Sequence, residues 1–360
     1  MPQKRDILAV VLRWVLGAVF IFSGLVKCVD PVGTSIIVEK YLASYSLFAL
    51  MPAALGIAIA LSVVEVATGV MLVVGECRRW VSLFALCLMN VFLIITLLAA
   101  TLLPIGDCGC FGEMIKLTPW GSVLKNVVLI VIARVLYVMS SERRDDLPKR
   151  RTIIVTVVAI LLPLAINFVS LRYLPLVDFM PYKEGVDLRD EVAKRNSDDA
   201  LRSELIFRRL STGEEVRFPQ DAMECWLDED LEYVDAQVVS TVEISGGEFA
   251  DFVVYDSEGG DATQVLLAKP GRVAWLCIND AEALGGERFE GVERLMASYP
   301  EQAIVVLVAS EEARERVTTT LDVAPYIIDR MTLRSMMRAK VGVVVINSGV
   351  IEVKLNILDV

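Results

Sequence analysis

The chain has 360 residues, of which 55% are hydrophobic, and its mean hydropathy is +0.57. This composition is typical of an integral membrane protein and excludes an ordinary soluble globule. The chain contains no histidine, which excludes His-dependent catalytic triads, imidazole proton relays and His-ligated haem.

Five stretches of about 18 or more mostly apolar residues predict membrane-spanning helices. They cover residues 7–27, 48–74, 80–103, 120–140 and 152–171. The charge changes where these stretches end. Residues 1–171 carry a net charge of +5, whereas residues 172–360 carry −16. The sequence therefore predicts a helical membrane bundle followed by an acidic soluble domain, and the acidic charge argues against nucleic-acid binding.

Lys and Arg cluster in alternate loops between the predicted spans. These clusters are Lys4 with Arg5, Arg78 with Arg79, and five residues within 143–151. Alternate loops lie on one side of a membrane, and the positive-inside rule assigns that side to the cytoplasm. The sequence thus predicts an inner-membrane, multi-pass protein whose C-terminal domain is extracytoplasmic, a periplasmic domain. The first span is expected to be retained, because residues 27–31 make a poor cleavage site.

Two cysteines separated by one glycine, Cys108 and Cys110, lie in the extracytoplasmic loop between the third and fourth predicted spans. A disulfide in so small a ring requires a bend that Gly109 permits, and it is expected to be strained and easily reduced. Thr118 and Pro119 then predict a helix N-terminus, whose positive end would lower a thiolate pKa nearby. We interpret the pair as a redox centre. The alternatives are inert thiols or a partial metal site, although a closed zinc site needs four ligands.

Cys28, at the outer end of the first span, is a candidate for a third exchanging thiol, and the alternative is a lone cysteine at the membrane boundary. Three charged residues lie within the spans at similar depths, namely Arg13, Glu65 and Arg134. Charges inside a bilayer are costly and usually pair within the bundle. We therefore expect a clasp in which two arginines flank Glu65, and the functional alternative is a polar site for a quinone or a proton path.

Strands alternate with helices in the acidic domain. Residues 204–218 and 252–267 predict two hairpins. The following elements are a strand at 273–278, a helix at 289–299, a strand at 303–309, a helix at 311–321, a short strand at 326–328, a helix at 332–338, and a hairpin at 341–346 and 350–355. This order predicts an α/β domain.

Several motifs in the membrane part resemble the DoxX/MauE family. They are Ser23-Gly24-Leu25-Val26-Lys27 with Asp30-Pro31, Glu65 with Gly69, the segment 107–112, and Lys125-Asn126. The resemblance covers residues 5–140 and implies a four-helix membrane bundle. The MauE branch is associated with methylamine utilisation (the methylamine metabolic process), where it is thought to help mature a disulfide-rich dehydrogenase. The family is grouped loosely with the vitamin K epoxide reductase type of bundle, which moves electrons between thiols and quinone.

The order of elements after residue 251 resembles the thioredoxin fold of membrane-tethered peroxiredoxin-like and cytochrome-maturation proteins. Two departures concern the active site of that fold. Cys277 lies within a strand and has no cysteine partner three residues on, and Lys340-Val341-Gly342 stands where a proline is expected. We therefore expect a degenerate domain without dithiol chemistry. Cys277 is expected in its core, with Cys225 either free or paired with it.

These features predict a DoxX/MauE-like four-helix domain at 1–140, and a cytoplasmic loop with a fifth span at 141–171. An extracytoplasmic connector with a hairpin at 172–250 and a degenerate thioredoxin-like domain at 251–360 follow. The favoured function is thiol–disulfide electron transfer through Cys108 and Cys110, supporting maturation of exported proteins. The expected partners are membrane lipid and an extracytoplasmic thiol protein, and quinone is the one cofactor considered. The alternative is a non-catalytic scaffold or assembly factor for envelope proteins.

Overall fold

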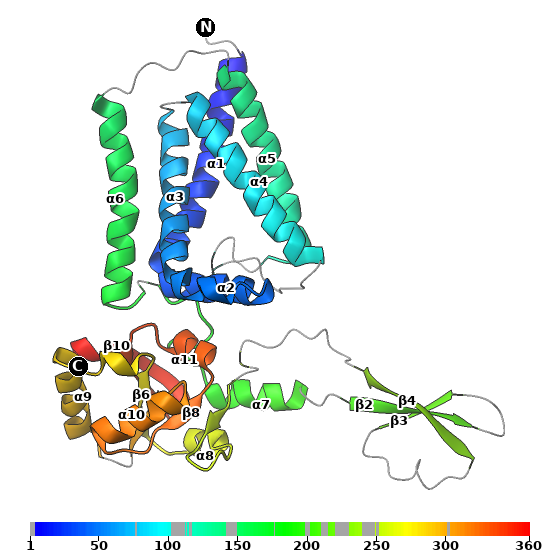
Figure 1. The fold of residues 1–360 in the computed structure, drawn as a ribbon, viewed down its shortest axis with the longest axis vertical. Coiled ribbons are helices and arrows are strands. Elements are labelled where there is room, and N and C mark those ends of the chain that lie inside the picture. Colours follow the sequence, from blue (N-terminus) through cyan, green and yellow to red (C-terminus); the bar gives the residue numbers. More distant parts are fainter. Residues whose placement is uncertain are drawn as a thin grey trace.

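The computed structural model describes residues 4–75, 78–101, 112, 114, 117–141, 150–175, 177–198, 202–209, 215–219, 230–239, 249, 252–300 and 303–360. A bundle of long helices forms one end of the molecule, and an α/β domain lies against the end of that bundle (Figure 1). A separate three-stranded sheet projects to one side of the α/β domain.

Five helices in the described part of the chain are long and apolar enough to span a membrane. They are α1 (Lys4–Val29), α3 (Ala54–Val74), α4 (Arg78–Thr101), α5 (Pro119–Ser141) and α6 (Arg150–Arg172). Large apolar side chains cover their outer surfaces, including Trp80, Leu124 and Phe168, which are more than 60% exposed. Such a surface is suited to lipid rather than water. The chain is thus a multi-pass membrane protein, and the five predicted spans are confirmed.

A further helix, α2 (Pro31–Ser44), was not predicted and lies across one end of the bundle (Figure 1). Its start follows from two residues. The Oδ1 atom of Asp30 accepts a hydrogen bond from the backbone N–H of Gly33 at 2.7 Å, and Pro31 occupies the first helical position. Both residues favour a helix N-terminus. A short 3-10 helix, η1 (Phe48–Ala53), then leads into α3.

Helices α1 and α3 pack backbone against backbone. A Cβ atom placed on Gly69 would lie 2.6 Å from the carbonyl oxygen of Gly17, and one on Gly24 would lie 2.8 Å from that of Ser62. Small residues at such positions allow the close approach on which helix association in membranes depends. The α4/α5 pair meets α1 near the end that holds the N-terminus and diverges from it toward α2 (Figure 1).

The α/β domain is built on one six-stranded sheet with the order β10-β9-β6-β7-β8-β5. The strands are β5 (Val254–Tyr255), β6 (Arg272–Ile278), β7 (Ile304–Val308), β8 (Tyr326–Ile328), β9 (Val341–Asn347) and β10 (Val350–Asn356). Strand β6 is parallel to β7 and β7 to β8, whereas β9 is antiparallel to both β6 and β10. Fully buried side chains cover both faces of β6, so helices protect the sheet on both sides.

The helices of this domain divide between the two faces of the sheet. Those contributing to the apolar cluster around Trp275 are α7 (Leu188–Asp198), α8 (Thr263–Leu267) and α11 (Arg330–Met336). Those on the opposite face are α9 (Glu287–Ser298) and α10 (Glu311–Leu321). The predicted order of strands and helices from residue 273 onward is confirmed, and the fold is a membrane bundle followed by an α/β domain.

The second predicted hairpin is wrong. Residues 264–267 form part of helix α8, and β5 pairs with β8 instead. The reason lies in the burial pattern: Ala262, Thr263, Leu266 and Leu267 are buried, whereas Gln264 and Val265 are exposed. Buried residues in pairs four apart fit the period of a helix and not the alternation of a strand.

The hairpin predicted at 204–218 is confirmed as β2 (Arg202–Arg209) and β3 (Glu215–Pro219), which pair in antiparallel register. A third strand, β4 (Leu231–Val239), joins the other edge of β2, so the unit is a sheet with the order β3-β2-β4. Neither β4 nor α7 was predicted. Helix α7 is mostly polar, and the apolar residues of β4 do not alternate strictly with polar ones.

Strand β10 is tied to the segment that leaves the bundle. The side-chain amide of Asn356 donates hydrogen bonds to the carbonyl oxygens of Arg172 at 3.0 Å and Tyr173 at 3.2 Å, at the end of α6. The Nζ atom of Lys354 bonds to the carboxylate of Asp178 a few residues further on. These contacts join the α/β domain to the end of the last span.

Candidate functional site

A cavity of about 440 Å³ lies where the helix pairs of the bundle diverge. Helices α1, α3, α4 and α5 supply its walls, and α2 closes one end. Most of the lining is apolar, with Phe20, Met89, Phe92 and Leu129 among the larger side chains. Ligand sites commonly have this size and combine an apolar wall with a few placed polar groups. The cavity is therefore the candidate functional site in the described part of the chain.

The polar part of the wall is centred on an ion pair between Lys27 of α1 and Glu65 of α3. The Nζ atom of Lys27 lies 2.8 Å from Oε2 and 3.1 Å from Oε1 of Glu65, and it also donates to the Oγ atom of Ser23 at 2.7 Å. The two charged side chains are only 3% and 2% exposed. A charge in the bilayer is expensive unless it is paired, so the pair presents a neutral, polar surface to the cavity.

A second polar group comes from Asn126 of α5, which is 1% exposed and lines the cavity. Its Nδ2 atom donates to the Oγ1 atom of Thr96 at 3.1 Å, and Thr96 in turn donates to the carbonyl oxygen of Phe92 at 2.9 Å. Among the described residues, the Oδ1 atom of Asn126 has no partner. A buried acceptor without a donor is costly. A ligand that donates a hydrogen bond would remove that cost.

Helix α2 closes the end of the cavity nearer the α/β domain, and we call it the roof helix. The side chains it contributes lie along one stripe of the helix, and they include Thr34, Ile37, Val38, Tyr41 and Leu42. Residues three, four and seven apart share a face of an α-helix, so this stripe is continuous. Other residues of α2, described below, contact the α/β domain.

The predicted clasp of Glu65 between two arginines is wrong. Glu65 pairs with Lys27, Arg134 is exposed on the surface of α5, and the guanidinium of Arg13 lies against Gly75. The antiparallel register of α1 and α3 explains this result. Gly17 lies opposite Gly69, so Arg13 is displaced from Glu65 by about 12 Å along the axis, given the 1.5 Å rise per residue.

The signal for the true pairing was present in the sequence but weak. Ser23 and Lys27 are four residues apart, so they share a face of α1, and a lysine side chain can extend back along that face. The family motif contains Lys27 but does not indicate its partner. The contribution of Asn126 was missed as well, although an amide within an apolar span is itself unusual.

Cys28 is fully buried and does not line the cavity. Its neighbours are Ser62 of α3 and Asn167 of α6, and the Nδ2 atom of Asn167 donates to the Oγ atom of Ser62 at 3.1 Å. The thiol is free. Its suggested part in thiol exchange stays a prediction, and its complete burial would require the helices to move.

Cys108 and Cys110 lie outside the described residues, but Gly112 and Thr118, which follow them in the chain, are described. Gly112, the last residue of the motif, has a φ of +56°, and a Cβ atom there would lie 3.2 Å from the Cγ1 atom of Val26. The motif therefore ends beside α1 at the residue preceding Lys27. Further along the chain, the Oγ1 atom of Thr118 accepts a hydrogen bond from the N–H of Gly121 at 3.2 Å. The predicted N-cap of the fourth span is confirmed.

Cys277 is fully buried in β6, as predicted, and its thiol is free rather than paired with Cys225, which lies outside the described residues. Burial raises the pKa of the Cys277 thiol from 9.0 to about 12, although nearby Lys354 acts in the opposite direction. A higher pKa leaves fewer thiolate ions, and the thiolate is the reactive form. The position is unsuited to thiol chemistry.

Iodoacetamide should therefore alkylate Cys277 in the folded protein at pH 8 about a thousandfold more slowly than an exposed thiol. The reason is that the pKa of Cys277, about 12, lies three units above the ordinary thiol value of 9.0. The rate should rise about tenfold per pH unit, because below the pKa the thiolate fraction increases with pH. Peptide mass spectrometry after timed labelling measures both quantities. The denatured chain is the control and should react at the ordinary rate, and fast labelling of the native chain would contradict burial of the thiol.

These observations define a multi-pass membrane protein that carries a lipid-embedded cavity and a fused α/β domain. Residues 5–139, which cover nearly all of α1 to α5, match the family described as Methylamine utilisation protein MauE. The resemblance that the motifs predicted is thus confirmed for residues 5–139. The match does not extend to α6 or to the α/β domain. No curated protein and no solved structure matches the chain.

Proposed function

We propose that this protein moves electrons between thiols and a membrane carrier through Cys108 and Cys110. The observation that carries the proposal is the position of Gly112. This residue ends the cysteine motif and lies against Val26, and the next residue of α1, Lys27, lines the cavity. The two positions on α1, Val26 and Lys27, are consecutive in the chain. The thiol loop is thereby attached near the polar part of the cavity.

A quinone is the class of carrier that fits the cavity. Oxidation of the Cys108 and Cys110 thiols to a disulfide releases two electrons and two protons, which a quinone takes up when it becomes a hydroquinone. The cavity volume of about 440 Å³ suits a substituted ring with a short apolar tail. The Oδ1 atom of Asn126 can accept a hydrogen bond from a hydroxyl of the reduced ring, and the Lys27–Glu65 pair offers a neutral polar surface beside it.

The remaining elements of the proposal concern location and partners. The distribution of Lys and Arg supports insertion of the helices in the inner membrane, with the thiol loop and the α/β domain on its extracytoplasmic side. The family description supports a role in methylamine-utilisation-related processes, and an exported thiol protein under maturation would be the partner. The strand order β10-β9-β6-β7, with β6 parallel to β7, supports a thioredoxin-like domain without its dithiol.

The two cysteines should cycle as a reversible disulfide with a midpoint potential above roughly −300 mV, the range of labile rather than structural bridges. Intact cells are equilibrated in dithiol buffers of graded potential and labelled with a membrane-impermeant thiol reagent, and mass spectrometry then quantifies Cys108 and Cys110. Buried Cys277 is the internal control and should stay unlabelled. Cysteines that react only after permeabilisation would contradict the orientation. A pair that stays reduced at every potential would contradict the redox role.

The alternative is a scaffold that holds envelope proteins together without chemistry. One observation favours it: the α/β domain has no partner cysteine for Cys277 and is firmly docked on the bundle. The double substitution Cys108→Ser with Cys110→Ser separates the two functions. A scaffold should complement a deletion strain in this form, whereas a redox protein should lose its function.

A further inference from the structure

The roof helix α2 has a second set of contacts, separate from those it makes with the cavity. Ser35 and Glu39 are four residues apart and therefore share a stripe of the helix. Both bind the side chain of Arg334 from helix α11 of the α/β domain. The Nη1 atom of Arg334 lies 2.7 Å from each carboxylate oxygen of Glu39, and its Nη2 atom donates to the Oγ atom of Ser35 at 2.8 Å.

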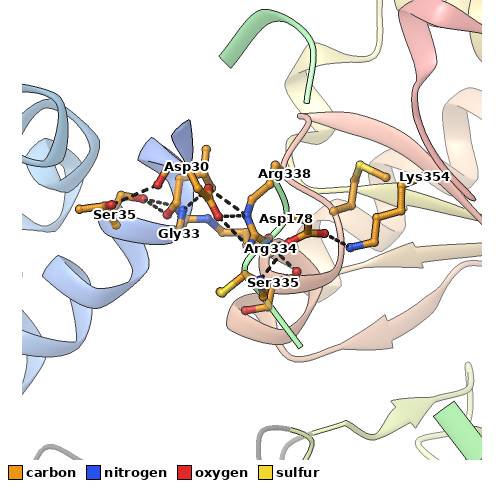
Figure 2. Close-up of polar contacts among 12 residues, drawn as sticks. Asp30, Gly33, Ser35, Asp178, Arg334, Ser335, Arg338 and Lys354 are labelled. Carbon is orange, nitrogen blue, oxygen red and sulfur yellow. Dashed lines mark hydrogen bonds and ion pairs between the residues drawn. The ribbon is translucent and has the colours of Figure 1, made fainter. Parts of the chain in front are cut away.

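A second arginine holds the start of the roof helix. The Nε and Nη2 atoms of Arg338 both lie 3.0 Å from the Oδ2 atom of Asp30, and the two side chains are 4% and 5% exposed (Figure 2). Asp30 is the residue whose carboxylate caps α2 through Gly33. Arg338 is itself fixed by hydrogen bonds to the carbonyl oxygens of Arg334 and Ser335. We call these paired contacts the α2–α11 interface.

The charges around this interface are balanced. Asp178, in the segment after the last span, lies 3.8 Å from Arg338 and bonds to Lys354 of β10 (Figure 2). Two arginines and one lysine of the α/β domain thus face three carboxylates, of which two belong to α2 and its cap. Buried ion pairs of this kind add little net stability compared with apolar contacts, but removal of one partner leaves an uncompensated charge. Their effect is to fix one arrangement of the two surfaces.

We propose that the α/β domain locks the roof of the membrane cavity. Helix α11 holds α2 across the opening between the diverging helix pairs, and release of the domain frees α2 and admits water or a ligand from that side. The cavity residues Thr34 and Ile37 move with α2, so binding in the cavity and docking of the domain are thermodynamically coupled, each strengthening the other. The lock depends on the α2–α11 interface alone and does not require chemistry at Cys108 or Cys110.

Hydrogen–deuterium exchange of the full-length protein tests the lock. Arg334→Glu should place a second carboxylate beside Glu39, and Glu39→Arg should place a second guanidinium beside Arg334. Like charges then repel in either variant. Each single substitution should raise the exchange rate of residues 31–44 at least tenfold. The exchanged pair, Glu39→Arg with Arg334→Glu, should bring the rate back to that of the unmodified protein.

The matched control is Arg272→Glu, which removes an exposed ion pair with Glu352 elsewhere on the same domain and should leave α2 unchanged. Peptides from β6 and β9 report whether the domain itself stays folded. In a second readout, a water-soluble thiol reagent labels a Thr34→Cys variant. Adding Arg334→Glu to this variant should raise its labelling rate at least tenfold. Exchange that is unchanged in both single variants would overturn the lock. So would an equal rise in the Arg272→Glu control, or failure of the exchanged pair to restore protection.

Discussion

Replacement of Lys27 by methionine should destabilise the membrane bundle by about 3–5 kcal/mol, the usual cost of removing one partner of a buried ion pair. Methionine matches the length of lysine but leaves the Glu65 carboxylate uncompensated at 2% exposure. The free energy of unfolding can be measured by denaturant titration of the protein in detergent micelles. The same substitution should weaken binding of a quinone analogue, because an unpaired carboxylate would replace the neutral surface of the cavity.

The double substitution Lys27→Met with Glu65→Met should recover most of the lost stability. Buried ion pairs replaced by apolar residues of similar volume are often neutral or stabilising. Lys40→Met is the matched control: this residue of α2 is exposed, and its loss should change stability by no more than about 0.5 kcal/mol. Equal costs at Lys27 and Lys40, or a double variant less stable than Lys27→Met alone, would show that the pair does not support the bundle.

Gly69→Val should separate α1 from α3 and cost at least about 3 kcal/mol, more than the usual 1–3 kcal/mol of overpacking. A Cβ atom at this position meets backbone atoms, at 2.6 Å from the carbonyl oxygen of Gly17 and 2.8 Å from the N–H of Ile21. Backbone atoms cannot rotate away as a side chain can. Loss of this contact would also move Glu65 away from Lys27, so quinone-analogue binding should fall together with stability.

Gly56 of the same helix supplies the control for this substitution, because a Cβ atom there meets nothing within 4 Å. Gly56→Ala should be neutral or stabilise the helix by up to about 1 kcal/mol through its higher helix propensity. The two variants can be compared by thermal unfolding in the same detergent. A Gly69→Val protein as stable as Gly56→Ala would contradict the close approach of α1 and α3.

Elements with a local signal could be predicted from the amino-acid sequence alone. Each span is a continuous apolar stretch, because the bilayer requires about 20 apolar residues whatever the neighbouring helices are. The strands from residue 273 onward could be predicted for a related reason: β6, β7 and β9 are short continuous apolar runs, which are typical of strands buried on both faces. The core position of Cys277 followed from its place inside an apolar strand, and the N-cap at Thr118 from two adjacent residues.

The contacts between residues distant in the chain became visible only in the three-dimensional structure. The partner of Glu65 depends on the register of α1 against α3, which close glycine contacts set and which composition does not reveal. Strand β5 pairs with β8, which lies far along the chain, and not with residues 264–267 as predicted. The ion pair of Arg338 with Asp30 joins residues 308 positions apart in the chain. Such contacts have no local signature, since they arise when two separately folded surfaces come together, and both the cavity and its roof depend on them.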